Sequence, residues 1–575
     1  MPNPLRESFR LTSVCRNLAF AVLAALLARP ATAADTSHGM VVSAQRLASE
    51  AGLAILEAGG NAVDAAVAVG YALAVVDPCC GNIGGGGFML IHIAGAAGHE
   101  GSDTFINFRE TAPAAATPDM YLDAAGNPIR DASRAGYRAV AVPGTVRGLD
   151  VARARYGRLK RATLMAPAIA LARDGFVLGE PDVAIIARDA KLLAADPEAA
   201  RIFLHPDGTP YKAGERLIQA DLAATLEKIA AQGPDAFYRG SIAPALASAS
   251  AAHGGIMTEA DLAQYTATEL PPLTCAYRSY RIVSSPPPSS GGTTLCEILD
   301  IVSGWDMASA GFQSPRAVHL AVEAMRRAFL DRNSLLGDPD FVTNPVERLL
   351  SPAYAELLRH GIDPDKATPS AALGTAPTAD EKPQTTHYSV VDGEGNAVAV
   401  TYTVNGFFGA GVVAPGTGFL LNNEMDDFAV KPGKANMFGL VQGDANAIRP
   451  KKRPLSSMTP TIVEKDGRPV FVLGSPGGPR IITAVLEVLM NLIDFGMTPD
   501  QAVAAARFHQ QYLPDTVFYE TGGLPPATLS ALQAMGYSLK EQPPWSAVEL
   551  IALGVDGALT GVSDQRRPAG AALGY

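Results

Sequence analysis

Cysteine is scarce in this sequence, with five residues among 575. Cys15 lies in a segment that we expect to be removed, and the mature chain keeps Cys79, Cys80, Cys275 and Cys296. A chain of this length can build its core without disulfides. Adjacent Cys79 and Cys80 are not expected to pair with each other, because such a bond strains the backbone. For Cys275 and Cys296, a disulfide and free thiols both remain open.

Zinc-binding patterns are missing as well. The cysteine spacings fit no zinc motif, and the nine histidines form no HExxH-like pair. We therefore predict neither a metal site nor a cofactor.

Long apolar runs and an excess of basic residues are also lacking. After residue 33, no stretch reaches the 18 uninterrupted apolar residues of a membrane span. Residues 481–494 come nearest, but Glu487, Asn491 and Asp494 interrupt them, which favours a buried amphipathic helix. The chain carries a net charge of −11 and has no tract of Lys and Arg with interleaved aromatic residues. Nucleic acid and anionic lipid are therefore not expected partners.

The N-terminus has the three parts of a secretory signal peptide. Arg6, Arg10 and Arg16 precede a short apolar run over residues 18–28, and the small residues Ala31-Thr32-Ala33 follow. We predict that residues 1–33 are removed, that no membrane anchor remains, and that the mature protein is periplasmic or secreted.

Helical and strand-like segments alternate through the rest of the chain, which indicates an α/β protein. Helices are predicted over residues 45–58 and 62–76, with Asn61 as the N-cap of the second and Asp64 three residues later. The glycine run at 84–87 lacks the following Lys-Ser/Thr of a phosphate-binding loop, so we interpret it as a close-packing turn. Further predicted elements are strands near 88–94 and 104–108, a rigid loop at 283–292, helices between 294 and 336, a hairpin over 461–474, and a helix from about Arg480.

A connector without periodicity runs into a hairpin pattern in the last third of the chain. Residues 367–384 are poor in apolar residues and rich in Pro, Ala and Thr, which predicts an exposed loop. Residues 385–391 and 397–404 alternate in side-chain character around Asp392-Gly393-Glu394-Gly395-Asn396, which predicts a β-hairpin.

The register of this hairpin brings two threonines together. Pairing Val391 with Ala397 places Thr385 opposite Thr403, with their Cβ atoms roughly 5 Å apart. Two facing hydroxyls at a loop-to-strand junction suit a chain that cleaves itself between Gln384 and Thr385. The same residues are also ordinary strand composition, so the local pattern alone does not separate a nucleophile from an edge strand.

Six segments occur in an order that resembles the bacterial gamma-glutamyltranspeptidases, also called glutathione hydrolases. The likeness runs from His38 to Tyr575, and no single segment would carry it. The segments are NFRETAP at 107–113, QTTHY at 384–388, TYTVN at 401–405, LNNEMDDF at 421–428, RPLSSM at 453–458 and GSPGG at 474–478.

The resemblance implies a fold and a maturation route. It implies an α/β (α+β) protein with a four-layer αββα sandwich of the N-terminal nucleophile hydrolase type, built from two fragments of one precursor. The large subunit would span residues 34–384 and the small subunit residues 385–575, and the two would form a heterodimer.

The implied nucleophile is Thr385, made N-terminal by cleavage. Its freed α-amine, with a reference pKa of about 7.7–8.0, can take the proton of its own hydroxyl. Thr403 would orient that hydroxyl. Gly477 and Gly478, just before the helix near Arg480, would supply backbone donors to the oxyanion.

A γ-glutamyl group carries a carboxylate and an ammonium on one carbon. The resemblance assigns the carboxylate to Arg109, Ser456 and Ser457, and the ammonium to Asn405, Glu424 and Asp427. An arginine fork suits a carboxylate because it can bind both oxygens. Two residues depart from the family pattern: Glu424 stands where many bacterial relatives carry Gln, and Phe438 stands where a lid Tyr often lies.

Three functions remain to be distinguished. The first is transfer or hydrolysis of the γ-glutamyl group of glutathione and related compounds, with water, amino acids or peptides as acceptors. The second is a cephalosporin-type acylase for a glutaryl group, which lacks the ammonium; Asp427 and Glu424 argue against it. The third is a silent amino-acid-binding protein, against which Thr385, Thr403 and the glycine pair argue.

Overall fold

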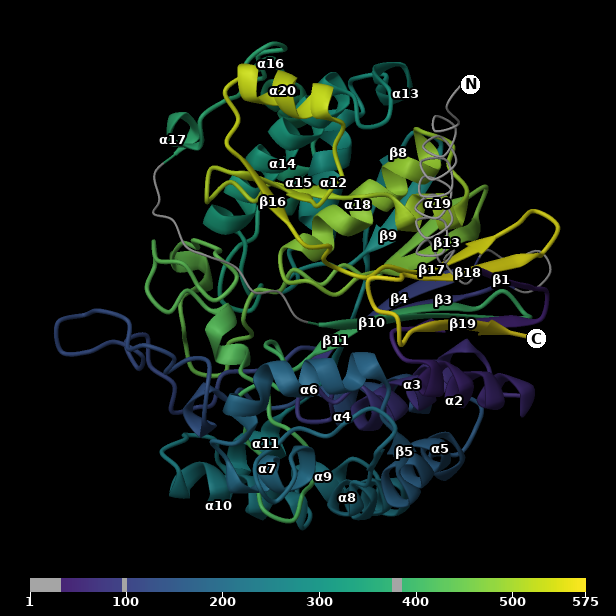
Figure 1. The fold of residues 1–575 in the computed structure, drawn as a ribbon, viewed down its shortest axis with the longest axis vertical. Helices are drawn as coiled ribbons and strands as arrows, with labels where there is room; N and C mark the ends of the chain where they lie inside the picture. The colour runs from purple at the N-terminus through teal and green to yellow at the C-terminus, as the bar shows by residue number, and fades with distance from the viewer. Residues whose placement is uncertain (1–32, 96–100, 375–384) are drawn as a thin grey trace, which may run out of the picture.

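Two antiparallel seven-stranded sheets form the centre of the molecule (Figure 1). The structure is a computed structural model, and it describes residues 33–95, 101–374 and 385–575. Gln384 and all of the predicted signal peptide except Ala33 lie outside these ranges.

The first sheet contains the predicted hairpin at its centre. Its strands, in spatial order, are β19 (Ala571–Gly574), β2 (Gly39–Ser43), β10 (Thr386–Asp392), β11 (Ala397–Thr403), β3 (Gly86–Ile93), β4 (Ser102–Phe108) and β7 (Thr268–Leu270).

The second sheet joins strands from both ends of the chain. Its strands are β1 (Ala33–Thr36), β18 (Leu559–Ser563), β17 (Glu549–Leu553), β13 (Arg468–Gly474), β12 (Thr461–Lys465), β9 (Tyr280–Ser284) and β8 (Leu273–Tyr277). Smaller sheets pair β5 (Phe176–Val177) with β6 (Arg216–Leu217), and β14 (Phe508–His509) with β15 (Val517–Glu520) and β16 (Leu539–Gln542).

Helices gather on opposite sides of the sheets (Figure 1). One group comprises α2 (Arg46–Glu57), α3 (Ala62–Val76), α4 (Thr145–Tyr156), α5 (Arg161–Asp174), α6 (Glu180–Leu193), α7 (Pro197–Phe203), α8 (Ala220–Gln232), α9 (Asp235–Tyr238), α10 (Ile242–Ala252) and α11 (Glu259–Gln264). The other comprises α12 (Gly291–Val302), α13 (Met307–Ala310), α14 (Pro315–Leu335), α15 (Val346–Leu349), α16 (Pro352–His360), α17 (Ser370–Leu373), α18 (Arg480–Ile493), α19 (Pro499–Ala504) and α20 (Pro526–Ala534). Within the described residues, none of these helices combines the length and the apolar character needed to cross a membrane.

The side chains along each strand point alternately into different hydrophobic cores, of which three are large. On β10, Val390 packs with α2 and α3 while Val391 packs against the second sheet. On β13, Val472 faces the first sheet while Leu473 packs with α12, α14 and α18. Because successive strand side chains point to opposite faces, each sheet is buried on both sides.

Most predicted elements are confirmed. The second predicted helix spans Ala62–Val76, and Asn61 and Asp64 form a capping box at its start. Val391 pairs with Ala397, as the hairpin register requires. The glycine run packs closely, since a Cβ on Gly85 would lie 1.9 Å from the Thr403 carbonyl oxygen.

Two predicted loops are partly wrong. The loop at 283–292 is shorter, because β9 continues to Ser284 and α12 begins at Gly291. Glycines open that helix because a Cβ on Gly291 would lie 2.3 Å from Thr459 Oγ1. The connector at 367–384 contains the short helix α17, and its residues 375–384 lie outside the described ranges.

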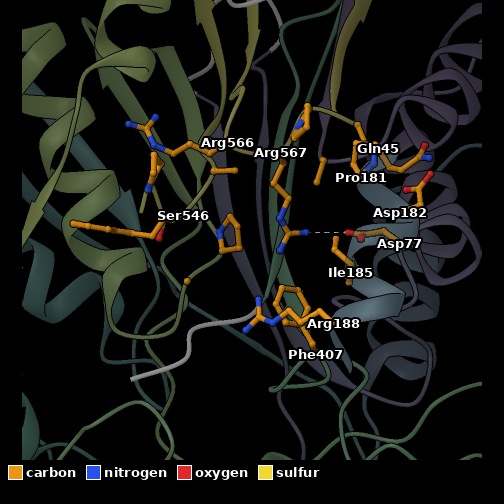
Figure 2. A pocket seen from close by; sticks show the side chains of 18 of the residues that line it. Gln45, Asp77, Pro181, Asp182, Ile185, Arg188, Phe407, Ser546, Arg566 and Arg567 are labelled. Carbon is orange, nitrogen blue, oxygen red and sulfur yellow. Dashed lines mark hydrogen bonds and ion pairs between the residues drawn. The ribbon is translucent and has the colours of Figure 1, made fainter. Parts of the chain in front are cut away.

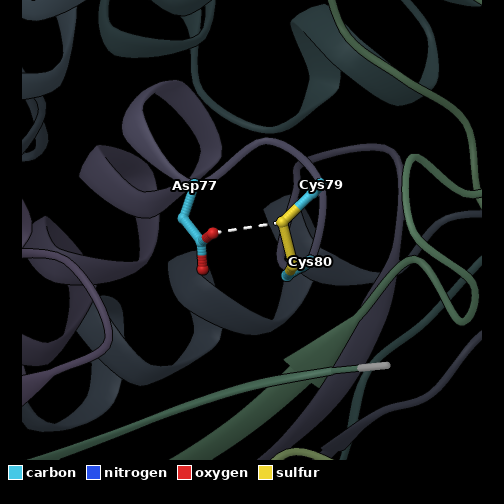
Figure 3. A group of neighbouring side chains, drawn as sticks. All are labelled: Asp77, Cys79 and Cys80. Atoms are coloured by element: carbon cyan, nitrogen blue, oxygen red, sulfur yellow. Dashed lines mark hydrogen bonds between the residues drawn. A yellow bond between two sulfur atoms is a disulfide. The ribbon is translucent and has the colours of Figure 1, made fainter. Parts of the chain in front are cut away.

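The expectation for Cys79 and Cys80 is also wrong, because their sulfur atoms form a disulfide (Figure 3). Neighbouring cysteines are kept apart in extended backbone, but residues 78–80 form a turn directly after α3. Asp77 Oδ1 lies 3.2 Å from Cys79 Sγ. A second disulfide joins Cys275 on β8 to Cys296 on α12, which settles the alternative that the sequence left open.

Candidate active site

A small cavity of about 20 Å³ lies where the ends of β10 and β11 meet the loop before α18. Ten residues named from the sequence line it: Thr385, Thr403, Asn405, Glu424, Asp427, Phe438, Ser456, Ser457, Arg109 and Gly478. Gly477 lies beside it, on the wall of a larger neighbouring cavity. Seven separate stretches of chain therefore converge on one place.

Thr385 directly precedes β10, and Thr403 is the last residue of β11. Thr386 pairs with Tyr402, so continuing the register sets Thr385 opposite Thr403. The backbone N–H of Asn405 donates to Thr403 Oγ1 at 2.8 Å, which leaves the Thr403 hydroxyl proton to be donated elsewhere. Arg567 Nη2 donates to the Thr385 carbonyl oxygen at 3.0 Å.

His387, two residues beyond Thr385, is a poor proton acceptor. Its side chain is fully buried, and this burial lowers its pKa to about 3. Its Nδ1 lies 2.8 Å from Thr401 Oγ1. A proton taken by this imidazole would be held weakly.

The two glycines before α18 have backbone conformations that favour glycine. Their φ angles are 134° for Gly477 and 57° for Gly478. A Cβ on Gly477 would lie 2.1 Å from Ser546 Oγ, and one on Gly478 would lie 2.8 Å from Phe438 Cδ1. Only glycine, which has no Cβ, lets this backbone approach Ser546 and Phe438 so closely. Their amides lie at the N-terminus of a 14-residue helix, where partial positive charge collects.

Arg109, directly after β4, is fully buried beside carboxylates on the short helix η2 (Glu424–Asp427). Its Nη2 is 2.5 Å from Asp427 Oδ2, its Nη1 pairs with Glu424, and its Nε donates to the Pro454 carbonyl oxygen at 3.1 Å. Burial opposes the charge of Arg109, but Glu424 and Asp427 outweigh it and raise the pKa of the guanidinium. Burial raises the pKa of both carboxylates, and Arg109 opposes that shift.

Phe438 is buried against Gly478. It is 3 % exposed, and its carbonyl oxygen accepts from Gln511 Nε2 at 3.1 Å. Phe438 thus lines the cavity, and Gln511 holds its backbone; its role as a lid remains a prediction.

Arg332 and Glu110 belong to the site and were missed by the sequence reasoning. Arg332 on α14 is buried, and it donates to Ser457 Oγ and Ser290 Oγ at 2.9 Å each. Burial lowers its pKa to about 10. Glu110 lies 3.5 Å from Arg109 Nη1, and burial raises its pKa to about 7. The signal for Glu110 was its place in the NFRETAP segment, whereas nothing local distinguishes Arg332 from other arginines of its helix.

Among the residues that the structure describes, two groups of side chains offer potential metal ligands, and each group makes other bonds. In the first, Asp77 faces Cys79 and Cys80, whose sulfurs form a disulfide and offer no thiolate. In the second, His92 pairs with Asp103 and with Glu464, and Arg281 pairs with both carboxylates.

Comparisons with known proteins agree with this geometry. The family model described as Gamma-glutamyltranspeptidase matches residues 48–574. The chain is 50 % identical to a glutathione hydrolase proenzyme of Pseudomonas sp. (strain A14), covering 94 % of each chain. It is 47 % identical to one of Escherichia coli (strain K12), covering 94 % of this chain and 92 % of that one.

A solved structure matches nearly the whole fold. The cephalosporin acylase from Bacillus halodurans superposes with a TM-score of 0.83 at 27 % identity, covering 100 % of this chain and 99 % of that chain. Transpeptidase and acylase thus share this mixed α/β architecture, so the fold does not separate them, and the relatives at 50 % and 47 % identity are both glutathione hydrolase proenzymes. The chain belongs to the gamma-glutamyltranspeptidase family and is an enzyme of γ-glutamyl transfer and hydrolysis.

Proposed function

We propose that Thr385 is the nucleophile that removes the γ-glutamyl group from glutathione and related γ-glutamyl compounds. The observation that carries this proposal is the cavity in which Thr385 meets Thr403, Gly478 and the Arg109–Asp427 ion pair. Attack by Thr385 Oγ forms a γ-glutamyl ester and releases the amine. Water, an amino acid or a peptide then takes the acyl group.

The proton of the Thr385 hydroxyl passes to the α-amine of the same residue. The low pKa of His387 supports this assignment, because an amine with a reference pKa of about 7.7–8.0 is a much better acceptor near neutral pH. Thr403 donates to Thr385 Oγ and fixes its direction. The amides of Gly477 and Gly478 stabilise the oxyanion.

Substrate binding exchanges one set of ion pairs for another. The α-carboxylate of the γ-glutamyl group binds Arg109 together with Ser456 and Ser457, and its ammonium binds Asp427, Glu424 and Asn405. Since Arg109 already pairs with Asp427 and Glu424, the zwitterion inserts between charges that otherwise neutralise each other. Arg332 holds the Ser457 hydroxyl from behind, which leaves its proton for the substrate.

Cleavage between Gln384 and Thr385 produces the two subunits, residues 34–384 and 385–575, after removal of residues 1–33. Three cores stacked across two sheets support the four-layer αββα arrangement of an N-terminal nucleophile hydrolase. The mature heterodimer acts in the periplasm or outside the cell.

The test is the fate of the chain when Thr385 is changed. On a denaturing gel, wild-type protein should give two bands, and the small one should begin with Thr385 on N-terminal sequencing. Thr385→Ala should give one uncut chain, while Thr386→Ala should still be cut. A Thr385→Ala protein that splits at the same bond would show that Thr385 does not drive cleavage.

A further inference from the structure

The position of Thr385 depends on contacts outside its own strand. Pairing of β10 with β11 begins at Thr386 and Tyr402, so Thr385 lies beyond the last pair of the ladder. Arg567, in the turn between β18 and β19, donates from Nη2 to the Thr385 carbonyl oxygen at 3.0 Å. A hydrogen bond from a guanidinium is stronger than one from a neutral donor, so this contact is suited to hold the residue.

This bond becomes more important after cleavage, under the proposed function on which the inference rests. A cut before Thr385 removes the covalent anchor on the amino side of the residue. The Cα of Thr385 carries both the α-amine and the side chain with Oγ. Because the peptide group is planar, a fixed carbonyl oxygen limits the movement of this Cα. It thereby limits the directions from which Oγ can approach a substrate.

Arg567 is itself fixed through its side chain and its backbone. Its Nη1 lies 3.3 Å from Asp77 Oδ2, and Figure 2 shows this ion pair as a dashed line in the cavity of about 430 Å³ that both residues line. Its backbone N–H donates to the Asp564 carbonyl oxygen at 2.9 Å, and its carbonyl oxygen accepts from the N–H of Gly570 at 3.0 Å. The guanidinium is therefore in place before any substrate binds.

Asp77 is fixed as well. It is the C-cap residue of α3, and its N–H donates to the Leu73 carbonyl oxygen at 2.8 Å. Its Oδ1 lies 3.2 Å from Sγ of Cys79 in the disulfide (Figure 3). Burial raises the pKa of Asp77 to about 6, and Arg567 opposes this shift. At neutral pH Asp77 is therefore an anion that pairs with Arg567.

The turn that follows α3 also packs against the start of β10. A Cβ on Gly81 would lie 2.5 Å from Thr386 Cγ2, so this turn touches the residue next to Thr385. The end of α3 therefore approaches Thr385 by two routes, one through the side chains of Asp77 and Arg567 and the other through Gly81.

We propose that Asp77 and Arg567 are positioning residues for the nucleophile. Asp77 fixes the guanidinium of Arg567, and Arg567 fixes the carbonyl group of Thr385, so that Oγ meets the acyl carbon from one direction. Neither side chain takes or gives a proton. The pair also joins the two proposed fragments, because Asp77 precedes the cut and Arg567 follows it.

The experiment removes the guanidinium and then supplies it in solution. Pre-steady-state release of p-nitroaniline from γ-glutamyl-p-nitroanilide gives the acylation rate of wild type and Arg567→Ala. Guanidinium chloride is added at concentrations too low to unfold the protein, and urea, which is planar and uncharged, is the control additive. Arg188→Gln is the control variant, because Arg188 lines the same cavity and pairs with its neighbour Asp189.

A double variant separates positioning from stability. Arg567→Ala leaves Asp77 buried without its partner, which destabilises the fold. Asp77→Asn/Arg567→Ala removes that charge as well, so its melting temperature should exceed that of Arg567→Ala. Its acylation rate should nevertheless stay low, because the bond to the Thr385 carbonyl is still missing.

In Arg567→Ala, the acylation rate should fall roughly 10- to 100-fold, as is typical of a slightly misplaced reacting group. The donor concentration at half-saturation should change little, because Arg109 and Asp427 still bind the γ-glutamyl group. Guanidinium should restore part of the rate and urea should not. The double variant should need more guanidinium for the same recovery, since Asp77 no longer binds it. Arg188→Gln should acylate at the wild-type rate.

Both self-cleavage and acylation use Thr385 Oγ, so recovery of self-cleavage is the readout for any variant that remains uncut. A wild-type rate in Arg567→Ala overturns the inference alone. So does a loss that guanidinium does not reverse, or that urea reverses equally. No release of p-nitroaniline by wild type overturns the proposed function and the inference with it.

Discussion

At the scale of single residues, the proposed function makes the triad of Arg109, Asp427 and Glu424 the basis of substrate selection. One cation faces two carboxylates whose pKa values burial raises. A substrate with only a carboxylate would compete with both carboxylates for Arg109. A substrate that also brings an ammonium satisfies both signs of charge, so we expect this triad to favour γ-glutamyl over glutaryl groups.

Asp427→Asn tests this preference. The change leaves the substrate ammonium buried without its partner, at a typical cost of about 2–5 kcal/mol. We expect kcat/KM for γ-glutamyl-p-nitroanilide to fall much more than that for the matching glutaryl anilide. Arg109→Ala serves as the comparison and should damage both substrates, since both present a carboxylate. If the ratio of the two kcat/KM values is unchanged in Asp427→Asn, the hypothesis that the protein is an acylase must be considered again.

The pH dependence of acylation reports on the base. The rate should rise as the Thr385 α-amine loses its proton, in a range near its reference pKa of about 7.7–8.0. His387, with its pKa near 3, contributes no transition there. A pre-steady-state acylation rate that is flat from mildly acidic to alkaline pH would exclude the amine as the base.

At the scale of elements, the end of β11 rests on the glycine run beside β3. A Cβ on Gly85 would lie 1.9 Å from the Thr403 carbonyl oxygen, a distance that no small adjustment of a side chain relieves. The run therefore sets the position of Thr403 through the backbone.

Gly85→Ala should push back the end of β11 and misplace Thr403. We expect self-cleavage to slow, activity to fall and the melting temperature to drop, because backbone cannot move aside as a flexible side chain does. Gly361→Ala is the control, since its Cβ would meet nothing closer than 3.4 Å. A Gly85→Ala protein with normal cleavage and stability would show that the strand end can shift freely.

Elements specified by neighbouring residues could be predicted from the sequence, and those specified by distant contacts could not. The capping box of α3 and the Val391–Ala397 register depend on residues a few positions apart. The glycine start of α12 depends on Thr459, and the role of Arg332 depends on Ser457, 125 positions away. Cleavage and the subunit boundary remain predictions, because Gln384 lies outside the described residues.

At the scale of the whole molecule, an ion network fastens the two sheets together. His92 on β3 and Asp103 on β4 belong to the first sheet, while Glu464 on β12 and Arg281 on β9 belong to the second. His92 Nδ1 lies 2.8 Å from Asp103 and 3.2 Å from Glu464, and Arg281 bonds both carboxylates. Burial opposes the charge of His92, but the two hydrogen-bonded carboxylates outweigh burial and raise its pKa to about 9.

This raised pKa makes one part of the stability depend on pH. The folded protein holds the His92 proton more tightly than the unfolded chain does, so the contribution is fully present below about pH 6.5 and is lost as pH rises through about 9. His92→Gln should lower the melting temperature at pH 6 and make much less difference at pH 10. His38→Gln, at an exposed histidine, is the control. An equal loss for His92→Gln at both pH values would mean that its charge does not hold the sheets together.

The interleaving of strands has a consequence for the proposed cleavage before Thr385. In the first sheet, β10 and β11 lie between β2 and β3, and β19 borders β2, so strands from either side of the cut alternate. The second sheet is mixed in the same way. Neither fragment contains all the strands of either sheet. The two fragments therefore cannot dissociate unless both sheets unfold. Two differently tagged samples of mature enzyme, mixed and incubated, should form no hybrid heterodimers. Each small subunit should stay with the large subunit that was cut from the same precursor.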